Sequence, residues 1–428
     1  MDSPHKRRWF VVAGFLAGLA AVIWLAIRQP APGDVVLSDG RRFTLKAVTF
    51  GTQHRYVHGG LLGRWMAPAI PARWRSRLGF RELSFQTAAP TLMVWGEWRF
   101  SLTNSPANYA AVADAAGVES AAVHYQSSFY SPKSHAIFGW NFSNYPRREK
   151  KIRFCLYPAG NARSVRLAKL EIANPALAVA APWKVASLPI TRREANIDFT
   201  LTEFTVGGPI PRSWPTPFPL VTPWNTATFQ IAAAGRPAPH WRLITMNVSD
   251  ASDNIFNCRL DSITTGPGEI RCRFPEVLWP SETGCRLVAE FVRTGKFDSN
   301  DVWTALAVPV PKPNSPVRIT PDVERYGVKI TSVNLDATSS GPVAPGAVRA
   351  TAHLVLHTRP PVRGVRPLLA AAKDNQDRAV KFQEISLLQD GTLWFALEIP
   401  TGAAAVDLTF ALTRTHFVEF VAQPARTR

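Results

Sequence analysis

The sequence predicts an all-β protein that one transmembrane helix holds at a membrane. Short alternating apolar runs occur along the chain, and 36 prolines outnumber 26 glycines, which fits strands and loops better than long helices. One long uncharged apolar stretch near the N-terminus predicts the helix. Hydrophobic residues make up 46% and charged residues 19% of the 428 residues, so packed domains are expected rather than disorder.

The apolar stretch runs from Trp9 to Ile27. A helix of this length, at about 1.5 Å per residue, spans the roughly 30 Å hydrocarbon core of a bilayer. Residues 1–8 form a short basic tail, and positive charge favours the cytoplasmic side of a span. The bulk of the chain is therefore expected outside the cytoplasm, although Arg41, Arg42 and Lys46 reduce the charge difference.

A cleaved signal peptide would begin in a similar way. Its apolar region is usually shorter, about 7 to 15 residues, and small residues mark its cleavage site. Here the stretch ends in bulky residues (Trp24–Ile27), and Arg28 and Pro30 follow. We therefore expect a permanent anchor, and cleavage near Ala20 is the alternative.

The rest of the chain repeats one pattern three times, which indicates duplicated domains. Each copy opens with a strand in which apolar and polar residues alternate, as one buried face requires. The opening strands are residues 43–51, 199–207 and 328–335. Each copy spans about 110 to 150 residues, the size of a whole β-sandwich domain rather than of a solenoid repeat.

Later landmarks recur in the same order. Each copy has an acidic site, an apolar or aromatic residue before proline, a penultimate strand, a last strand and a final proline. The acidic sites are Asp114, 250–254 and 374–377, and the proline steps are 145–146, 274–275 and 399–400. The penultimate strands are 152–157, 287–292 and 406–412, and the final prolines are Pro175, Pro309 and Pro424. Copies two and three also share an Arg-Thr step, at 293–294 and 414–415.

We therefore predict three tandem antiparallel β-sandwich domains of Ig-like architecture, at residues 34–174, 183–309 and 317–428. Residues 174–182 and 310–316 are the predicted linkers, and the second is a proline-rich, semi-rigid spacer. Three sandwiches in series would project from the membrane as a short stalk. The Ig-like description is an analogy of architecture alone and predicts no activity, because one fold can carry many functions.

The chain has four cysteines and no CxxC pair, so a zinc site is not expected. Cys258 and Cys272 flank the turn signal at 264–269, and a hairpin there would bring them within disulfide reach. An oxidising compartment would favour the bond. Two buried thiols are the alternative, Cys285 is a competing partner, and Cys155 is expected to be free.

Acidic loops offer weak candidates for a calcium site, because calcium takes about six to eight oxygen ligands. The candidates are Asp250, Asp253, Asn254, Asp298, Asn300 and Asp301. The alternative is that these side chains satisfy backbone groups in turns. The histidine pairs 54/58 and 353/357 lack a third ligand, and no cofactor is expected.

A basic and aromatic segment lies between residues 63 and 81 of the first domain. Its candidate membrane-surface residues are Arg64, Trp65, Arg73, Trp74, Arg75 and Arg77. Tryptophan favours the interface and arginine pairs with phosphate, so the segment is a candidate for contact with anionic headgroups. The alternative is a loop with packed tryptophans and solvated arginines. Nucleic acid is not expected as a partner of an exported domain.

No nucleophile elbow, P-loop or HExxH motif is present, and no enzymatic activity is predicted. The leading hypothesis is a membrane-anchored extracytoplasmic binding or scaffold protein of a bacterial-type envelope, with the bilayer and other envelope proteins as partners. One alternative is a glycan-acting enzyme, which needs two carboxylates about 5 to 9.5 Å apart in a cleft. Another is a basic module for anionic lipid or polysaccharide, since the net charge is +18.

Overall fold

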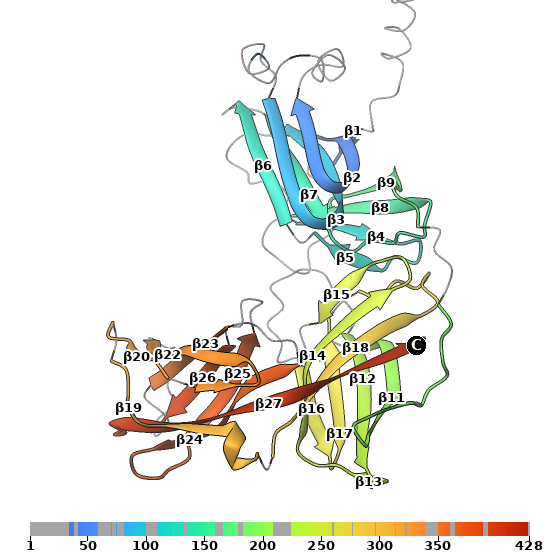
Figure 1. Cartoon of the computed structure of the whole chain (residues 1–428). Helices are drawn as coiled ribbons and strands as arrows, with labels where there is room; N and C mark the ends of the chain where they lie inside the picture. Colours follow the sequence, from blue (N-terminus) through green and yellow to red (C-terminus); the bar gives the residue numbers. More distant parts are fainter. Residues whose placement is uncertain are drawn as a thin grey trace, which may run out of the picture.

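The computed structural model is built of β-strands, which confirms the all-β class (Figure 1). It describes residues 34–37, 42–58, 70, 74, 81–99, 109–122, 124–131, 135–158, 166–178, 183–208, 224–258, 261–275, 277–295, 297–312, 314–321, 323–338, 350–359, 364–387 and 393–426. The predicted basic tail and the span at 9–27 lie outside these residues. Within them, no helix is both long and apolar enough to cross a membrane.

Domain 1 consists of two antiparallel sheets. The first has the order β1 (Asp34–Val36), β2 (Arg42–His58), β3 (Arg81–Arg99), β7 (His135–Phe142), β6 (His124–Ser131). The second has the order β5 (Glu119–Ala121), β4 (Tyr109–Ala113), β8 (Lys151–Tyr157), β9 (Ala168–Ala173). Side chains of both sheets, such as Trp98, Trp140 and Phe154, form one buried core between them.

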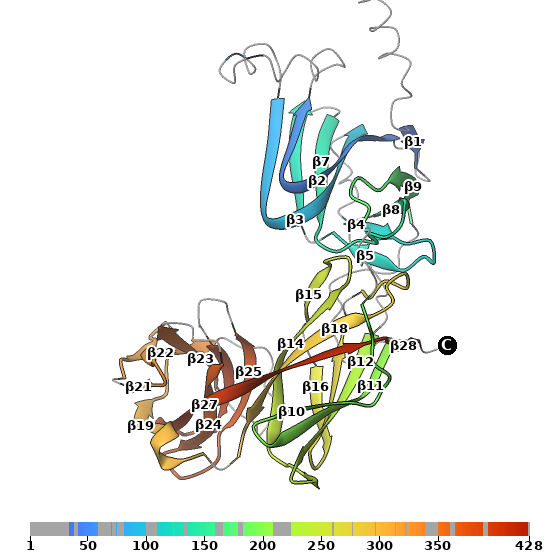
Figure 2. The same ribbon diagram turned by 45° about the vertical axis from the view of Figure 1, so that its right-hand side comes forward.

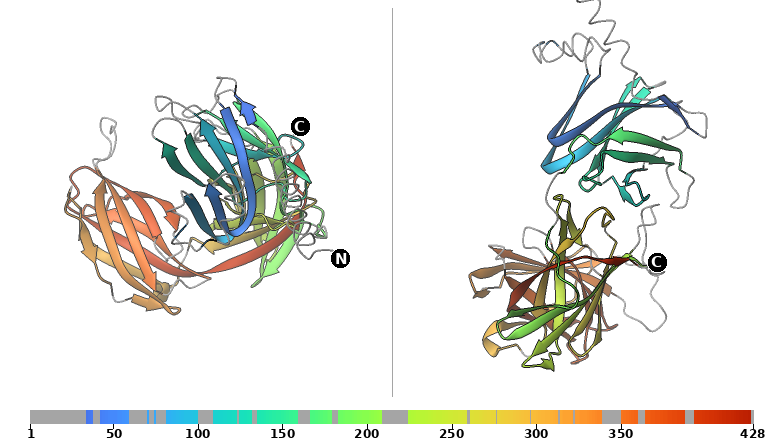
Figure 3. Two further views of the ribbon diagram at one scale, coloured as in Figure 1. Left: turned by 90° about the horizontal axis from the view of Figure 1, so that it is seen from above. Right: turned by 90° about the vertical axis from the view of Figure 1, so that its right-hand side faces the viewer.

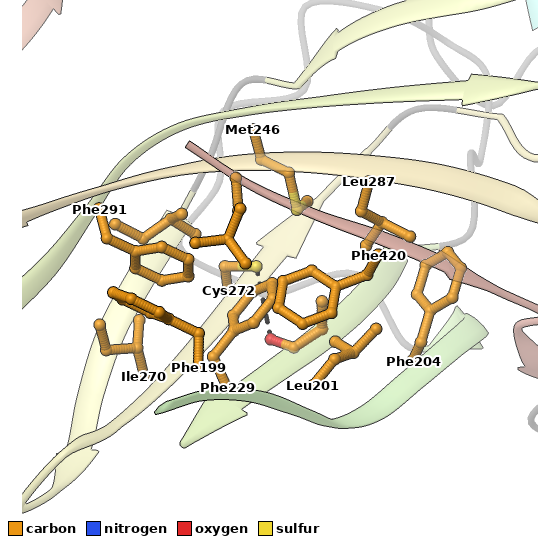
Figure 4. Close-up of a cluster of buried hydrophobic side chains, with 14 of the residues drawn as sticks. Phe199, Leu201, Phe204, Phe229, Met246, Ile270, Cys272, Leu287, Phe291 and Phe420 are labelled. Carbon is orange, nitrogen blue, oxygen red and sulfur yellow. Dashed lines mark hydrogen bonds between the residues drawn. The ribbon is translucent and has the colours of Figure 1, made fainter. Parts of the chain in front are cut away.

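Domain 2 repeats this arrangement. Its first sheet has the order β10 (Ile190–Glu194), β11 (Ile197–Gly208), β12 (Trp224–Ala233), β17 (Glu269–Phe274), β16 (Asp261–Gly266), with β13 (Arg236–Pro237) on β12 and β28 (Ala425–Arg426) on β11. Its second sheet has the order β15 (Ile255–Cys258), β14 (Trp241–Asp250), β18 (Cys285–Arg293), β27 (Ala405–Ala422). Alternating apolar residues of both sheets fill the core, and Figure 4 shows Phe199, Phe229 and Phe420 within it.

Domain 3 follows the same plan. Its first sheet has the order β20 (Val317–Ile319), β22 (Val328–Thr338), β23 (Ala350–Arg359), β26 (Leu393–Ile399), β25 (Lys381–Leu387), with β21 (Val323–Arg325) also on β22. In its second sheet, β27 pairs with β24 (Val365–Asp374) on one side and with β19 (Val302–Pro309) on the other. The 3-10 turn η2 (Ser299–Asp301) precedes β19.

The same acidic turn occurs in all three domains. Asp114, Asp250 and Asp374 are each at most 2% exposed. Asp250 and Asp374 end the strands β14 and β24, and Asp114 directly follows β4. The carboxylate of each accepts a hydrogen bond from the backbone N–H four residues later, at 2.7, 3.0 and 2.9 Å. The residue three positions later has a positive φ each time, at Gly117, Asp253 and Asp377. One turn conformation at one place in each fold supports true repetition, including that of the first copy.

The last strands of domains 2 and 3 are exchanged. In domain 1, β8 pairs with the next strand along the chain, β9. In domain 2, β18 instead pairs with residues 415–422 at the C-terminal end of β27. The next strand, β19, pairs with residues 405–411 of the same β27 and belongs to domain 3. The strand β27 therefore runs through both domains, as Figures 1 and 2 show.

This exchange changes the predicted domain limits. Residues 302–309 contribute Ala305 and Val308 to the core of domain 3, whereas residues 415–422 contribute Val418 and Phe420 to that of domain 2. The proline-rich segment 310–316 consequently connects β19 to β20 inside one domain and is not an interdomain spacer. Domain 3 lies beside domain 2 rather than beyond it, so the three domains do not form a straight stalk (Figure 3).

The long β2–β3 hairpin of domain 1 folds back on its own sheet. The pairing is interrupted between Gly51 and Gln53, where Gly51 has a φ of 141°, a value that favours glycine. Beyond this bend, Tyr56 stacks on Trp95 with ring centroids 5.5 Å apart. Tyr56 and Trp95 belong to a second buried cluster, separate from the main core.

Candidate functional site

The predicted calcium ligands separate into two groups that lie at different domain junctions. In the first group, the carboxylate of Asp250 accepts hydrogen bonds from the Ser252 N–H at 3.0 Å, the Ser252 hydroxyl at 2.8 Å and the Asn254 N–H at 3.0 Å. Its other oxygen accepts one from the Asn254 side chain at 2.8 Å. These donors fix the turn, and a metal ion would have to displace them, which favours the structural interpretation of the loop.

Asn254 also joins domain 2 to domain 1. Its Oδ1 accepts a hydrogen bond from the backbone N–H of Tyr145 at 3.2 Å, and its Nδ2 donates to the backbone carbonyl of the same residue at 3.1 Å. Asn254 and Tyr145 are both fully buried. The Asn254 amide thus makes the two hydrogen bonds that a neighbouring strand would make to the backbone of Tyr145. Without them, the buried N–H and carbonyl of Tyr145 would be left unpaired.

A buried ion pair lies in the same junction. The Arg148 guanidinium of domain 1 donates to Glu282 of domain 2 at 2.8 Å, and the Glu282 side chain is 2% exposed. Burial raises the pKa of Glu282, while the hydrogen bonds from Ser252 and Arg148 act in the opposite direction. Asp250 and Glu282 are thus two neighbouring carboxylates, but Ser252, Asn254 and Arg148 occupy them within the junction. This environment differs from the open cleft that a glycosidase pair requires.

The second group of predicted ligands lies near the junction of domains 2 and 3. Asp298, Ser299 and Asn300 are exposed in and next to η2, and Asp301 accepts a hydrogen bond from the Tyr326 hydroxyl at 2.7 Å. The Arg414 guanidinium lies 5.0 Å from the centre of the Tyr326 ring. In the part of the chain that the structure describes, no three His, Cys, Asp or Glu side chains gather as a metal site.

Glu290 and Arg366 connect domains 2 and 3. Arg366 on β24 donates to both carboxylate oxygens of Glu290 on β18, with Nε to Oε1 at 2.8 Å. The hydroxyl groups of Thr415 and Thr245 complete the site at 2.9 and 3.0 Å. Glu290 is 1% exposed as a side chain, so its charge is neutralised and its oxygens are hydrogen-bonded away from water.

His54 fixes the folded-back hairpin of domain 1. The ring is 1% exposed and lies between Thr49, at 2.9 Å from Nδ1, and Thr91, at 2.9 Å from Nε2. The Asn141 side chain also donates to the Thr91 hydroxyl at 2.7 Å. Burial lowers the pKa of His54. This histidine, one of the pair that lacked a third metal ligand, is therefore a buried, hydrogen-bonded residue of β2.

The basic segment lies at the tip of this hairpin, between the ends of β2 and β3. Trp74 is 48% exposed, in keeping with a surface position. The other membrane-surface candidates, Arg64, Trp65, Arg73, Arg75 and Arg77, lie outside the described residues. The end of β2 at His58, the start of β3 at Arg81 and the first strand, β1, all lie at the end of domain 1 remote from domain 2 (Figure 1).

The predicted disulfide is absent, and all four cysteines are thiols. The hairpin around residues 264–269 forms as predicted, but Ser262 and not Cys258 is opposite Cys272. Cys258 lies on β15 in the other sheet, because the chain changes sheets between β15 and β16. Both cysteines pack in the core of domain 2, and Cys272 donates to the Ala227 carbonyl at 3.4 Å (Figure 4).

Sequence patterns do not identify the junction residues Tyr145, Arg148, Glu290 and Arg366. In the sequence, Tyr145 stands out only as the residue before a proline, and the other three are ordinary charged residues of strands or turns. One available signal was the segment 405–422, which contains no Gly, Pro or Asn to turn the chain. Such a run predicts one long strand that outgrows a single domain.

Comparisons with known proteins add no functional assignment. No family model and no curated protein sequence matches the chain. Among solved structures, a conserved domain protein from Bacillus anthracis has 11% sequence identity over 65% of this chain and 83% of its own, with a TM-score of 0.18. The chain is similar to that protein only at this level, which carries no argument about function.

Proposed function

We propose that this protein is a membrane-anchored extracytoplasmic scaffold that presents three Ig-like β-sandwich domains in a fixed arrangement. The strand orders support the Ig-like description, since β2-β3-β7-β6 and β5-β4-β8-β9 follow the order of the ABED and C′CFG sheets. The observation that carries the proposal is the construction of the two junctions. Buried, hydrogen-bonded side chains hold domain 1 against domain 2, and exchanged strands together with a buried ion pair hold domain 2 against domain 3.

Rigid junctions suit a scaffold because they fix the distance and angle between surfaces on different domains. Flexible linkers would leave those surfaces to search for their partners, at a cost in conformational entropy on binding. The anchor at 9–27 would hold this body at the bilayer. A scaffold of this kind requires only surfaces, and its partners would be other proteins of the envelope.

Topology is the first test of this proposal. Reporter fusions after Asp34 and at Arg428 should both report an extracytoplasmic location, with a fusion before the span as the cytoplasmic control. A cytoplasmic signal from either fusion would overturn the compartment and the class of partner together. Small-angle scattering of a chain without residues 1–33 should then give the dimensions of one fixed shape.

A second candidate function is contact with anionic lipid by the segment at 63–81. The ends of β2 and β3 that flank this segment favour it, because they and β1 share one end of domain 1 (Figure 1). An anchor that precedes β1 would bring that end of the domain close to the headgroups, with which arginines can pair.

Cosedimentation with vesicles tests this second function. A chain without residues 1–33 should bind vesicles that contain anionic lipid, and replacing Arg73, Arg75 and Arg77 with glutamine should remove most of the binding. The matched control replaces Arg236, Arg318 and Arg325, which are exposed on domains 2 and 3. Equal losses in both variants would mean that only overall charge matters, and the proposed contact would be rejected.

A further inference from the structure

The exchange of last strands makes domain 2 dependent on a remote part of the chain. Eight residue pairs, from Cys285 with Ala422 to Val292 with Thr415, join β18 to the end of β27 without interruption. Val418, Phe420 and Ala422 are at most 3% exposed and face the core of domain 2. Without this segment, the edge of β18 and one side of the core would be exposed to water.

Residues 415–422 bind domain 2 through contacts that would be the same whether or not the two belong to one chain. Between β18 and β27 in the chain lie residues 294–404, which include nearly all of domain 3. The backbone ladder and the apolar pockets would be the same for an identical segment from another molecule. Whether domain 2 takes this segment from its own chain or from a second copy then depends on the effective concentration of each, as in other exchanged β-strands.

The connection into the segment also imposes no turn. Residues 412–416 are extended inside the continuous strand β27, and Thr415 contacts Glu290 at the point where the strand enters domain 2. Residues 415–422 could therefore pair with domain 2 of another copy without the opening of a tight hairpin. In domain 1 the equivalent strand, β9, is joined to its neighbour β8 by a local connection, which keeps it in its own domain.

We propose that the place beside β18 is a strand-acceptor site that a second copy of this chain fills, with residues 415–422 of each copy completing domain 2 of the other. Exchange takes place during folding, because in the folded protein the segment is held by a full ladder and by buried side chains. Domain 2 has to wait for its last strand while residues 294–414 are made and folded. In that interval a neighbouring copy competes for the vacant site.

Cysteine pairs placed across the strand border test the proposal in the full chain. Val288 and Glu419 are directly opposite each other on the outer face of β18 and β27. One copy carries Val288→Cys and a second, with a tag of different size, carries Glu419→Cys. The two are unfolded and refolded together, or co-expressed where refolding gives no soluble chain. A double variant with both substitutions shows that the bond closes within one copy.

The expected result is a disulfide between the two differently tagged copies, in a yield that rises at least several-fold with tenfold higher protein concentration. Each single variant refolded alone is the background. A matched pair in domain 1, Lys151→Cys and Ala173→Cys, is opposite across β8 and β9 and should close only within one copy. If the double variant closes and the mixed copies give no bond above background, exchange between copies is excluded. An equal yield of disulfide between copies from the domain 1 pair would show that the bonds arise from random collision of copies, and it would also reject the proposal.

Discussion

Glu290 and Arg366 face each other across the junction of domains 2 and 3, with both carboxylate oxygens of the glutamate bound to one guanidinium. The pair lies where β27 passes from one domain to the next, and Thr415 on that strand contributes a further hydrogen bond. The side chain of Glu290 is 1% exposed and that of Arg366 is 16% exposed. Loss of either partner would leave the other charge in a poorly hydrated site.

Replacing Glu290 with glutamine is expected to lower the free energy of unfolding of the joined domains by about 3 kcal/mol, since removal of one partner of a buried pair typically costs about 3 to 5 kcal/mol. Urea unfolding and hydrogen exchange of β18 and β24 would measure the loss. The control is Arg286→Gln on the same strand, where Arg286 pairs with Glu419 and both side chains are nearly half exposed. That change should cost less than about 1 kcal/mol. Equal losses would contradict a special role for the buried pair.

Asn254→Ala should loosen the junction of domains 1 and 2. The change removes both hydrogen bonds to the backbone of Tyr145 and leaves two buried groups unpaired, at a cost of about 1 to 3 kcal/mol each at most. Small-angle scattering should show a wider range of interdomain distances. Asp253→Asn, a substitution on the same turn that tolerates the positive φ of 65°, should leave the scattering unchanged. An unaltered profile for Asn254→Ala would remove this residue from the junction.

Calcium should leave the melting temperature unchanged, whether it is added or removed with a chelator. The carboxylate of Asp250 is saturated by Ser252 and Asn254, and Asp301 is bound to Tyr326. Magnesium serves as the control for general ionic effects. A rise in melting temperature with calcium alone would restore the metal-site interpretation of these loops.

The β2–β3 hairpin should become less stable as the pH falls below about 6.5, the ordinary pKa of histidine. Because burial lowers the pKa of His54, the folded hairpin binds fewer protons than the unfolded one in this range, and stability therefore rises with pH. Hydrogen exchange of residues 53–58 at pH 7.5 and at pH 5.5 would measure the change. His54→Gln should flatten this dependence, whereas His240→Asn, at an exposed site in domain 2, should preserve it. A dependence unchanged by His54→Gln would assign it to other groups.

The sequence predicted the repeated parts of the fold because they are encoded locally. Alternating residues marked the opening strands, and Asp114, Asp250 and Asp374 marked a turn that every domain needs at the same place. These features depend on contacts between near neighbours. An apolar face of period two and a carboxylate that caps its own turn are both visible in a short window of sequence.

The exchange of strands could not be predicted in this way. The segment at 415–422 has the same alternating pattern whether it pairs with its own domain or with the preceding one, since either site offers a strand edge and an apolar core. The pairing of Cys258 with Cys272 failed for a related reason. The turn at 264–269 was correct, but nothing local to Cys258 showed that β15 belongs to the opposite sheet.

The return of β27 to domain 2 also decides how the molecule would carry tension. The strand β28 pairs with β11, and Ala422 forms a bridge to Ala186, so residues 422–426 are bound to domain 2 and not to domain 3. A pull between Asp34 and Arg426 would therefore pass through domains 1 and 2. Domain 3 would be a side arm outside the loaded path, and it would keep its shape while the rest of the chain was stretched.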